Sequence, residues 1–233
     1  MNLGVVAISP TLNLASQRKR TFNDAQALTS VHEAGHVVCA ALLLDDVPDA
    51  AVSVTSASGM GGFVVRTQSE TLTQRDRLIR LTAFSLGGYV AEKLIYGEDN
   101  LTNGSSSDLE HATARVRHML GFSGFEIGPA YIQSSNSPFP IGVLDNSGEL
   151  DRLVLEYMRE AETMAASVLS SEHELLLKMS EALFRKGSLR KKEMTLIVNQ
   201  YAKLKAKDRK KPFPFKSILE EKLNSINGLQ KVA

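Results

Sequence analysis

The strongest constraint on this chain is the run HEAGH at residues 32–36, which lies inside a helical pattern. Small and apolar residues recur around it at three- and four-residue steps, which predicts an amphipathic helix from Asn23 or Asp24 to about Leu44. Histidines four residues apart lie on one helix face, so His32 and His36 can bind one zinc ion. Glu33 is then placed to take a proton from a zinc-bound water. The alternative is an ordinary helix whose histidines bind nothing.

A catalytic zinc site needs a third protein ligand and leaves a fourth position open. The remaining histidines are His111, His118 and His173, but Glu92 and Asp108 offer better geometry. Both acids lie in, or at the start of, helical segments rich in small residues. Asp108 has an alternative role as a charge that stabilises a helix N-terminus. The residues alone leave the choice between the two acids open.

The rest of the chain predicts a mainly α fold with a small β-hairpin. Residues 51–55 alternate as a strand, 59–62 form a glycine turn, and 63–65 form the returning strand. A second helix is expected from Thr71 or Thr73 to Tyr96, and a third at 108–120 with a serine cap. Residues 121–148 are rich in Gly, Ser and Pro and predict irregular structure. Further helices are expected at about 149–169, 172–185 and 189–204.

Composition favours a folded protein without a membrane span or an intrachain disulfide. With 43% hydrophobic residues, the 233-residue chain can bury a core. No apolar run approaches the roughly 18 residues of a membrane span, and no signal peptide is recognisable. Cys39 is the single cysteine, so no intrachain disulfide can form. These features favour a cytoplasmic location.

The charge is unevenly distributed. Residues 185–233 hold 14 of the 27 Lys and Arg residues but only 4 of the 26 Asp and Glu residues. The body is therefore acidic and the tail basic. A solvated, less ordered tail explains this pattern, and contact with nucleic acid, an anionic membrane surface or an acidic partner is the alternative. We expect a lead-in at 1–22, a domain that carries HEAGH at 23–204 and a basic tail at 205–233.

Four further segments carry a family resemblance. They read LGGYVAEKLIYG at 86–97, NGSSSDLEHAT at 103–113, GFSGFEIGP at 121–129 and LLLKMSEALFRKGSLRKKE at 175–193. Together with HEAGH, they resemble in order and spacing the peptidase domain of the FtsH-type AAA zinc metalloproteases, from Leu28 to about Val198. Tyr89 departs from the family's usual arginine, and Asn103, Ser105 and Ser107 also differ from the usual residues.

The resemblance implies a role for each matching residue. His32, His36 and Asp108 would be zinc ligands, Glu33 the general base, and Glu92 a supporting residue. The segment with Gly61, Gly62 and Phe63 resembles the hairpin edge along which an extended substrate is expected to add as a strand. The implied fold is a helical zincin-like domain with a small sheet at the cleft.

The resemblance does not extend to a motor domain. The sequence holds no GxxxxGK[ST] phosphate loop, and about 30 residues before HEAGH do not accommodate an ATPase. We therefore expect a zinc-dependent endopeptidase that acts on unfolded or exposed polypeptide segments without its own ATPase. A homo-oligomer, by analogy a hexamer, and a separate ATPase are candidate partners, as is an acidic protein that contacts the basic tail. The rival interpretations are a peptidase-like regulatory protein and a module that binds nucleic acid through its tail.

Overall fold

The computed structural model describes residues 22–54, 61–67, 74–125, 132–133, 143–144, 148–205, 209 and 213–230. The helices are α2 (Asp24–Leu43), α3 (Arg75–Ser85), α4 (Gly87–Tyr96), α5 (Ser106–Ser123), α6 (Glu149–Ser171), α7 (His173–Lys186), α8 (Lys191–Tyr201) and α9 (Phe215–Gln230). Two 3-10 turns, η1 (Glu98–Asn100) and η2 (Asn103–Ser105), lie between α4 and α5. The strands are β1 (Ala50–Val52), β2 (Phe63–Val65), β3 (Ile132–Gln133), β4 (Val143–Leu144) and β5 (Ser188–Arg190). The predicted mainly α architecture with a small sheet is confirmed.

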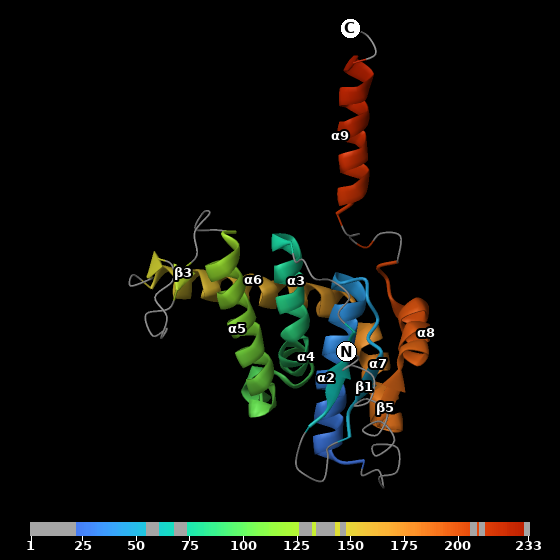
Figure 1. Cartoon of the computed structure of the whole chain (residues 1–233). Coiled ribbons are helices and arrows are strands. Elements are labelled where there is room, and N and C mark those ends of the chain that lie inside the picture. Colours follow the sequence, from blue (N-terminus) through green and yellow to red (C-terminus); the bar gives the residue numbers. More distant parts are fainter. Residues whose placement is uncertain are drawn as a thin grey trace, which may run out of the picture.

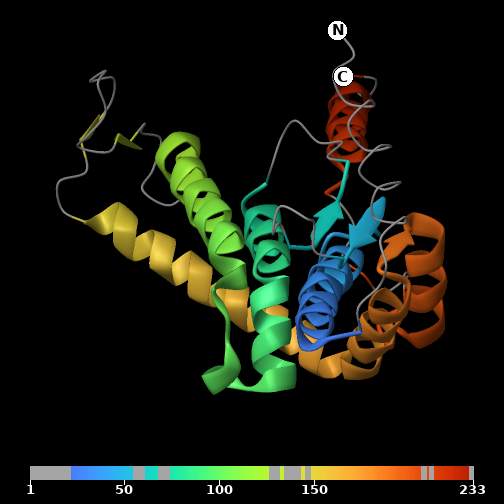
Figure 2. The same ribbon diagram turned by 90° about the horizontal axis from the view of Figure 1, so that it is seen from below.

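Helix α2 is the centre of the fold. It packs between the α3–α4 pair and α7, with the sheet along its side (Figures 1 and 2). The side chain of Asn23 accepts a hydrogen bond from the backbone N–H of Gln26 at 2.9 Å, so the predicted cap is confirmed. Every residue from Ser30 to Leu42 is buried. The HEAGH run therefore lies in the core.

Helices α2 and α4 approach each other more closely than side chains allow. A Cβ atom on Gly35 would lie 2.2 Å from the carbonyl oxygen of Gly87. Only glycine fits at this crossing, which explains an otherwise unfavourable residue inside α2. The crossing brings the first half of α4 against the HEAGH face of α2.

One long helix was expected up to Tyr96, and this prediction is wrong. The structure has two helices, because the chain bends at Leu86, the residue at which α3 ends and α4 begins. Gly87 and Gly88 follow the bend, and glycine pairs are common where helices break. The predicted start at Thr71 or Thr73 lies outside the described residues.

The main sheet is antiparallel with strand order β2-β1-β5. Ala51 pairs with Val64 on one side and with Leu189 on the other, so β2 is an edge strand of this sheet. The predicted strand at 63–65 is confirmed, whereas β1 covers Ala50–Val52 rather than 51–55. Strand β5 was missed, because two of its three residues, Leu189 and Arg190, were predicted to begin a helix. The predicted turn at 59–60 lies outside the described residues.

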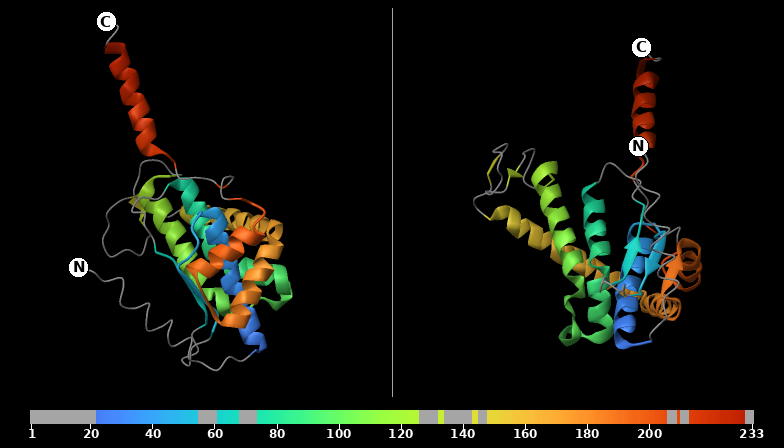
Figure 3. Two further views of the ribbon diagram at one scale, coloured as in Figure 1. Left: turned by 90° about the vertical axis from the view of Figure 1, so that its right-hand side faces the viewer. Right: turned by 60° about the horizontal axis from the view of Figure 1, so that its bottom comes forward.

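The chain ends in a helix that stands apart. Helix α9 projects away from the other helices in Figures 1 and 3, within the stretch that was predicted to be a less ordered basic tail. Of the predicted lead-in at 1–22, the structure describes Phe22 alone. Among the described residues, no helix combines the length and apolar character needed to cross a bilayer. The predicted boundaries of lead-in, domain and tail stay predictions.

Candidate metal centre

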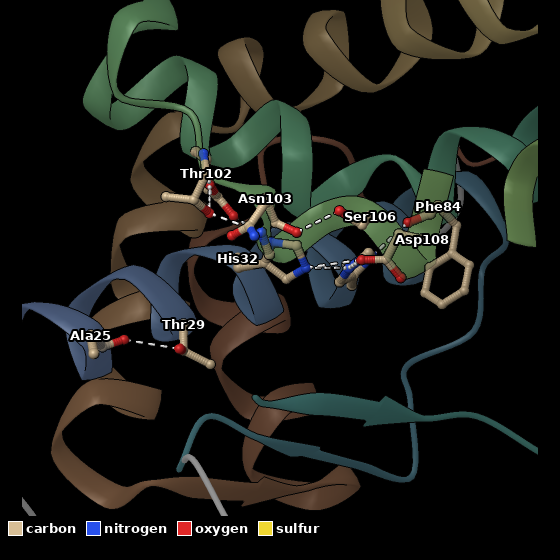
Figure 4. Close-up of polar contacts among 11 residues, drawn as sticks. Ala25, Thr29, His32, Phe84, Thr102, Asn103, Ser106 and Asp108 are labelled. Carbon is tan, nitrogen blue, oxygen red and sulfur yellow. Dashed lines mark hydrogen bonds and ion pairs between the residues drawn. The ribbon is translucent and has the colours of Figure 1, made fainter. Parts of the chain in front are cut away.

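Three side chains from two helices converge on one point. The Nε2 atoms of His32 and His36 in α2 lie 3.1 Å apart. The Oδ2 atom of Asp108, from the first turn of α5, lies 3.0 Å from Nε2 of His32 and 3.3 Å from Nε2 of His36. Figure 4 shows these contacts, with the His32 ring between Thr102 and Asp108. Among the described residues, these three form the group of His, Cys, Asp and Glu side chains close enough to share a metal ion.

The hydrogen bonds of the other ring nitrogens fix the tautomers. Nδ1 of His36 lies 2.8 Å from the carbonyl oxygen of Phe84, which can only accept, so this nitrogen carries the proton. Nδ1 of His32 likewise donates to Oε1 of Glu92 at 2.7 Å. Both Nε2 atoms are then left with lone pairs in the neutral rings. Two lone pairs and a carboxylate oxygen facing one another favour a shared cation.

The spacing of these atoms fits zinc. Ligand atoms about 2.0–2.1 Å from a tetrahedral zinc ion lie roughly 3.3 Å from each other. The observed separations of 3.0–3.3 Å match that value. Two imidazoles and one carboxylate also form a typical donor set for a catalytic zinc site, which leaves one position for water or substrate. The residues present therefore fit the ion.

Glu92 lies on the far side of His32 from Asp108. Its Oε1 accepts from Nδ1 of His32, and its Oε2 accepts from the Thr102 hydroxyl at 3.1 Å. Glu92 is 1% exposed, so these contacts are shielded from water. The structure thus separates the two acids that the sequence left open. Asp108 faces the Nε2 atoms, whereas Glu92 orients the ring of His32.

The protonation of His32 reflects the negative charge around it. Burial by itself lowers the pKa of His32, but the hydrogen bonds with Asp108 and Glu92 outweigh burial and raise this pKa to about 10. Burial raises the pKa of the Asp108 carboxyl, yet its hydrogen bonds with the two histidines bring the pKa well below its usual range. The ring of His32 is therefore in surroundings that favour a bound cation, either a proton or a metal ion.

Glu33 lies beside this group in a dry environment. Its side chain belongs to the cleft lining, yet the residue is only 4% exposed, and burial raises the pKa of Glu33 to about 7. The backbone of Gly62 covers the carboxylate so closely that a Cβ atom there would lie 2.6 Å from Oε1 of Glu33. The residues that precede β2 therefore cover the carboxylate that α2 carries.

The convergent side chains form the floor of a cleft of about 590 Å³. One wall is the segment Gly61–Val64 at the start of β2, and the opposite wall is the face of α5 that carries Asp108. Gly61, Gly62 and Phe63, predicted as the edge along which substrate adds, thus line the same cleft as the histidines. Their role in binding substrate stays a prediction.

Several neighbours of the site were not anticipated from the sequence. The carbonyl group of Phe84 accepts a hydrogen bond from His36, and the hydroxyl of Thr102 donates one to Glu92. Gly88 leaves room for the His32 ring, because a Cβ atom there would lie 2.4 Å from its Nε2. His111 and Arg115 line the cleft three and seven residues after Asp108, a helical spacing that could have revealed them.

The prediction that a serine side chain caps the start of α5 is wrong. Ser105 occupies the N-cap position, but its side chain makes no capping hydrogen bond. Instead, the side chain of Thr102 caps η2, the turn that precedes α5, by accepting from the N–H of Gly104 at 3.2 Å. The cap lies one turn earlier because the 3-10 turn η2 leads directly into α5. Asp108, in the first turn of α5, contacts the histidines.

Comparison with known proteins agrees with this geometry. The chain is 29% identical over 191 residues to the ATP-dependent zinc metalloprotease FTSH 11, chloroplastic/mitochondrial, of Arabidopsis thaliana, which covers 79% of this chain and 23% of that protein. It is 28% identical over 216 residues to the ATP-dependent zinc metalloprotease FtsH 3 of Synechocystis, which covers 85% and 35%. The chain thus spans about a quarter to a third of the length of these curated relatives. Residues 20–197, more than half of the chain, match the model of peptidase family M41, so the chain belongs to that family.

Proposed function

We propose that this chain is a zinc-dependent endopeptidase that hydrolyses unfolded or exposed peptide segments. The observation that carries the proposal is the convergence of three ligand atoms within 3.3 Å, beside a buried carboxylate in an open cleft. His32, His36 and Asp108 are the proposed zinc ligands. The printed names of the FtsH relatives, which describe zinc metalloproteases, support zinc as the ion.

The proposed mechanism assigns the proton transfers to Glu33. Bound zinc would supply a Lewis acid that polarises the scissile carbonyl group and makes water nucleophilic near neutral pH. The Glu33 carboxylate takes the proton of the attacking water and later delivers it to the leaving amine nitrogen. Glu92 keeps the proton of His32 on Nδ1, so that Nε2 stays available as a ligand.

The position of β2 supports an extended substrate. In the described sheet, β2 pairs with β1 on one side only, so its other edge is open to a further strand. The segment that leads into β2 lines the cleft and touches Glu33. A peptide that adds to this edge by main-chain hydrogen bonds would pass over the histidines. Such binding requires an unfolded segment.

Replacing the proposed base tests the function directly. Glu33→Gln should retain about one zinc per chain, because the three ligands survive, and lose most hydrolysis of an unstructured peptide. His36→Ala is the matched variant that should lose both zinc and activity. Zinc content by elemental analysis and cleavage of a fluorogenic peptide, each with and without chelator, measure the two properties.

The outcomes separate the rival interpretations. Near-normal hydrolysis by Glu33→Gln contradicts the mechanism. A wild-type chain that holds zinc but cleaves no peptide favours the regulatory interpretation. Since the sequence holds no phosphate-loop pattern, ATP should not change the rate of peptide cleavage. A homo-oligomer, a separate ATPase and an acidic partner of the basic tail stay proposals, and the same purified chain can be tested for each of them.

A further inference from the structure

One face of α5 continues the cleft beyond the metal ligands. Asp108, His111 and Arg115 follow each other at three- and four-residue steps, so they share one face of the helix, and all three line the cleft. Seven residues along a helix correspond to about 10 Å, so Arg115 begins two turns away from Asp108. This distance is about three residues of an extended peptide. A peptide bound in the cleft would therefore span the distance from Asp108 to Arg115 with about three residues.

The guanidinium group of Arg115 is anchored but not neutralised. Its Nη1 donates to the hydroxyl of Ser85 at 2.8 Å and to the carbonyl oxygen of Leu81 at 3.4 Å. Both acceptors are neutral, and across the described parts of the chain no carboxylate lies within 4.0 Å of Arg115. The side chain is half-buried, and burial lowers the pKa of Arg115, with a further contribution from the charge of Arg66. Arginine nevertheless stays charged in proteins.

Neighbouring cations differ from Arg115 in this respect. Arg66, at the end of β2, pairs with Asp46 at 3.2 Å and lies over the Phe84 ring. Arg117, two residues further along α5, pairs with Asp151 of α6. The acids of the cleft floor are also engaged, since Glu92 and Asp108 contact the histidines. Arg115 thus presents a positive charge to the cleft, while its anchoring bonds fix the direction in which the charge points.

We propose that Arg115 makes the cleft select peptides that carry an acidic side chain near the scissile bond. A half-buried cation without a counter-charge gains more from a carboxylate than an exposed one does. The anchoring by Ser85 reduces the entropy lost when the guanidinium binds that carboxylate. This proposal rests on the proposed function in that it takes a polypeptide to be the ligand of the cleft.

Binding and cleavage of matched peptides test the proposal. The probes are ten-residue peptides, blocked at both ends, in which one position holds Glu, Gln or Lys and is moved stepwise along the sequence. Affinity is measured by fluorescence anisotropy on the zinc-loaded Glu33→Gln chain, and kcat/KM on the wild-type chain. At one or two positions, we expect Glu to be favoured over Gln by about tenfold, the effect of one typical charge-assisted hydrogen bond.

Two variants assign this preference to Arg115. Arg115→Gln keeps a donor for Ser85 but removes the charge, and it should lose the preference for Glu, with a thermal midpoint near that of the wild type. Arg117→Gln removes a charge from the same helix outside the cleft and should keep the preference. Introducing Arg115→Glu should shift the preference to Lys, provided that circular dichroism shows a folded chain.

The possible results distinguish this proposal from the proposed function. Cleavage without a preference for Glu, or a preference that survives in Arg115→Gln, overturns the role of Arg115 and leaves the peptidase function standing. Selective binding of Glu peptides without any cleavage supports Arg115 and contradicts the peptidase function. A wild-type chain that neither binds nor cleaves any of these peptides overturns both.

Discussion

The two histidines of HEAGH have different partners, although they are chemically alike in the sequence. His32 donates to the carboxylate of Glu92, whereas His36 donates to the backbone carbonyl of Phe84. A carboxylate partner makes the imidazole more basic and a stronger ligand than a carbonyl partner does. The first histidine is therefore sensitive to a side-chain substitution, whereas the second depends on the position of the α3 backbone.

This difference predicts unequal effects of the two acids on zinc affinity. Asp108→Ala removes a proposed ligand and should lower zinc affinity severely, whereas Glu92→Gln keeps a hydrogen-bond acceptor near His32 and should cost about 10- to 100-fold. Competition titration against a chromophoric chelator measures both variants. A larger loss in Glu92→Gln than in Asp108→Ala would reverse the assignment of ligand and supporting residue.

The sequence predicted the members of the site better than their supports. The spacing of HEAGH fixes two histidines on one face, and the resemblance around residues 103–113 singled out Asp108. Phe84 contributes its carbonyl group, and Gly88 contributes the lack of a side chain. A backbone carbonyl group leaves no signal in residue type, and the glycine at 88 does not by itself reveal which side chain it makes room for, because both contributions depend on how α3 and α4 lie against α2. Arg115 did leave a signal, its seven-residue spacing from Asp108.

At the scale of elements, the crossing of α2 and α4 positions the site. Gly35 and Gly87 touch through their backbones, and this contact sets the distance from His32 to Glu92. Helix formation alone favours alanine over glycine by about 1 kcal/mol, so the crossing must outweigh this difference. The same Gly87 follows the bend at Leu86 that divides α3 from α4, where the sequence predicted one helix.

Two glycine substitutions in this crossing should separate stability from metal binding. In Gly35→Ala, the new methyl group meets the backbone of α4 at 2.2 Å, so the helices must move apart at a cost of about 1–3 kcal/mol. In Gly88→Ala, the methyl group meets the His32 ring, which can shift, so zinc affinity should fall about tenfold or more with a smaller loss of stability.

Urea unfolding of the zinc-free chains and zinc titration of the folded chains measure the two effects. Equal losses of stability in the two variants would show that the backbone of α4 moves as easily as the His32 side chain. This result would contradict the prediction that the backbone contact at Gly35 is the more costly one to disturb. The same crossing illustrates a limit of prediction from the sequence. By helix propensity alone Gly35 is unfavourable, and the reason for a glycine there becomes clear only from the close contact with Gly87.

At the scale of the whole molecule, several hydrogen bonds and an ion pair tie the chain after α8 to the body. Both carboxylate oxygens of Glu172 accept backbone hydrogen bonds at 2.8 Å, from Lys203 and Leu204. Arg209 pairs with Asp45 at the end of α2 at 3.1 Å, and its side chain is 8% exposed. The basic stretch therefore begins attached to the body and leads to α9, which carries exposed apolar side chains such as Phe215 and Leu219. Charge composition predicted the basic tail, but it could not predict this attachment, since it depends on one buried glutamate far back in the sequence.

Glu172→Ala should release this attachment without unfolding the body. The residue is 3% exposed, and its replacement removes the acceptors of the backbone N–H groups of Lys203 and Leu204. The attachment of this segment should lose about 1–3 kcal/mol of stability. The segment around Lys203 and Lys205 would then detach from the body more often. Trypsin should cleave after these lysines about tenfold faster or more, because 1.4 kcal/mol changes an opening equilibrium about tenfold. Glu174→Ala, at an exposed position two residues further along the chain, is the matched control and should leave the cleavage rate unchanged. Mass spectrometry of the early fragments identifies the sites, and equal cleavage rates in wild type and Glu172→Ala would show that Glu172 does not hold the segment.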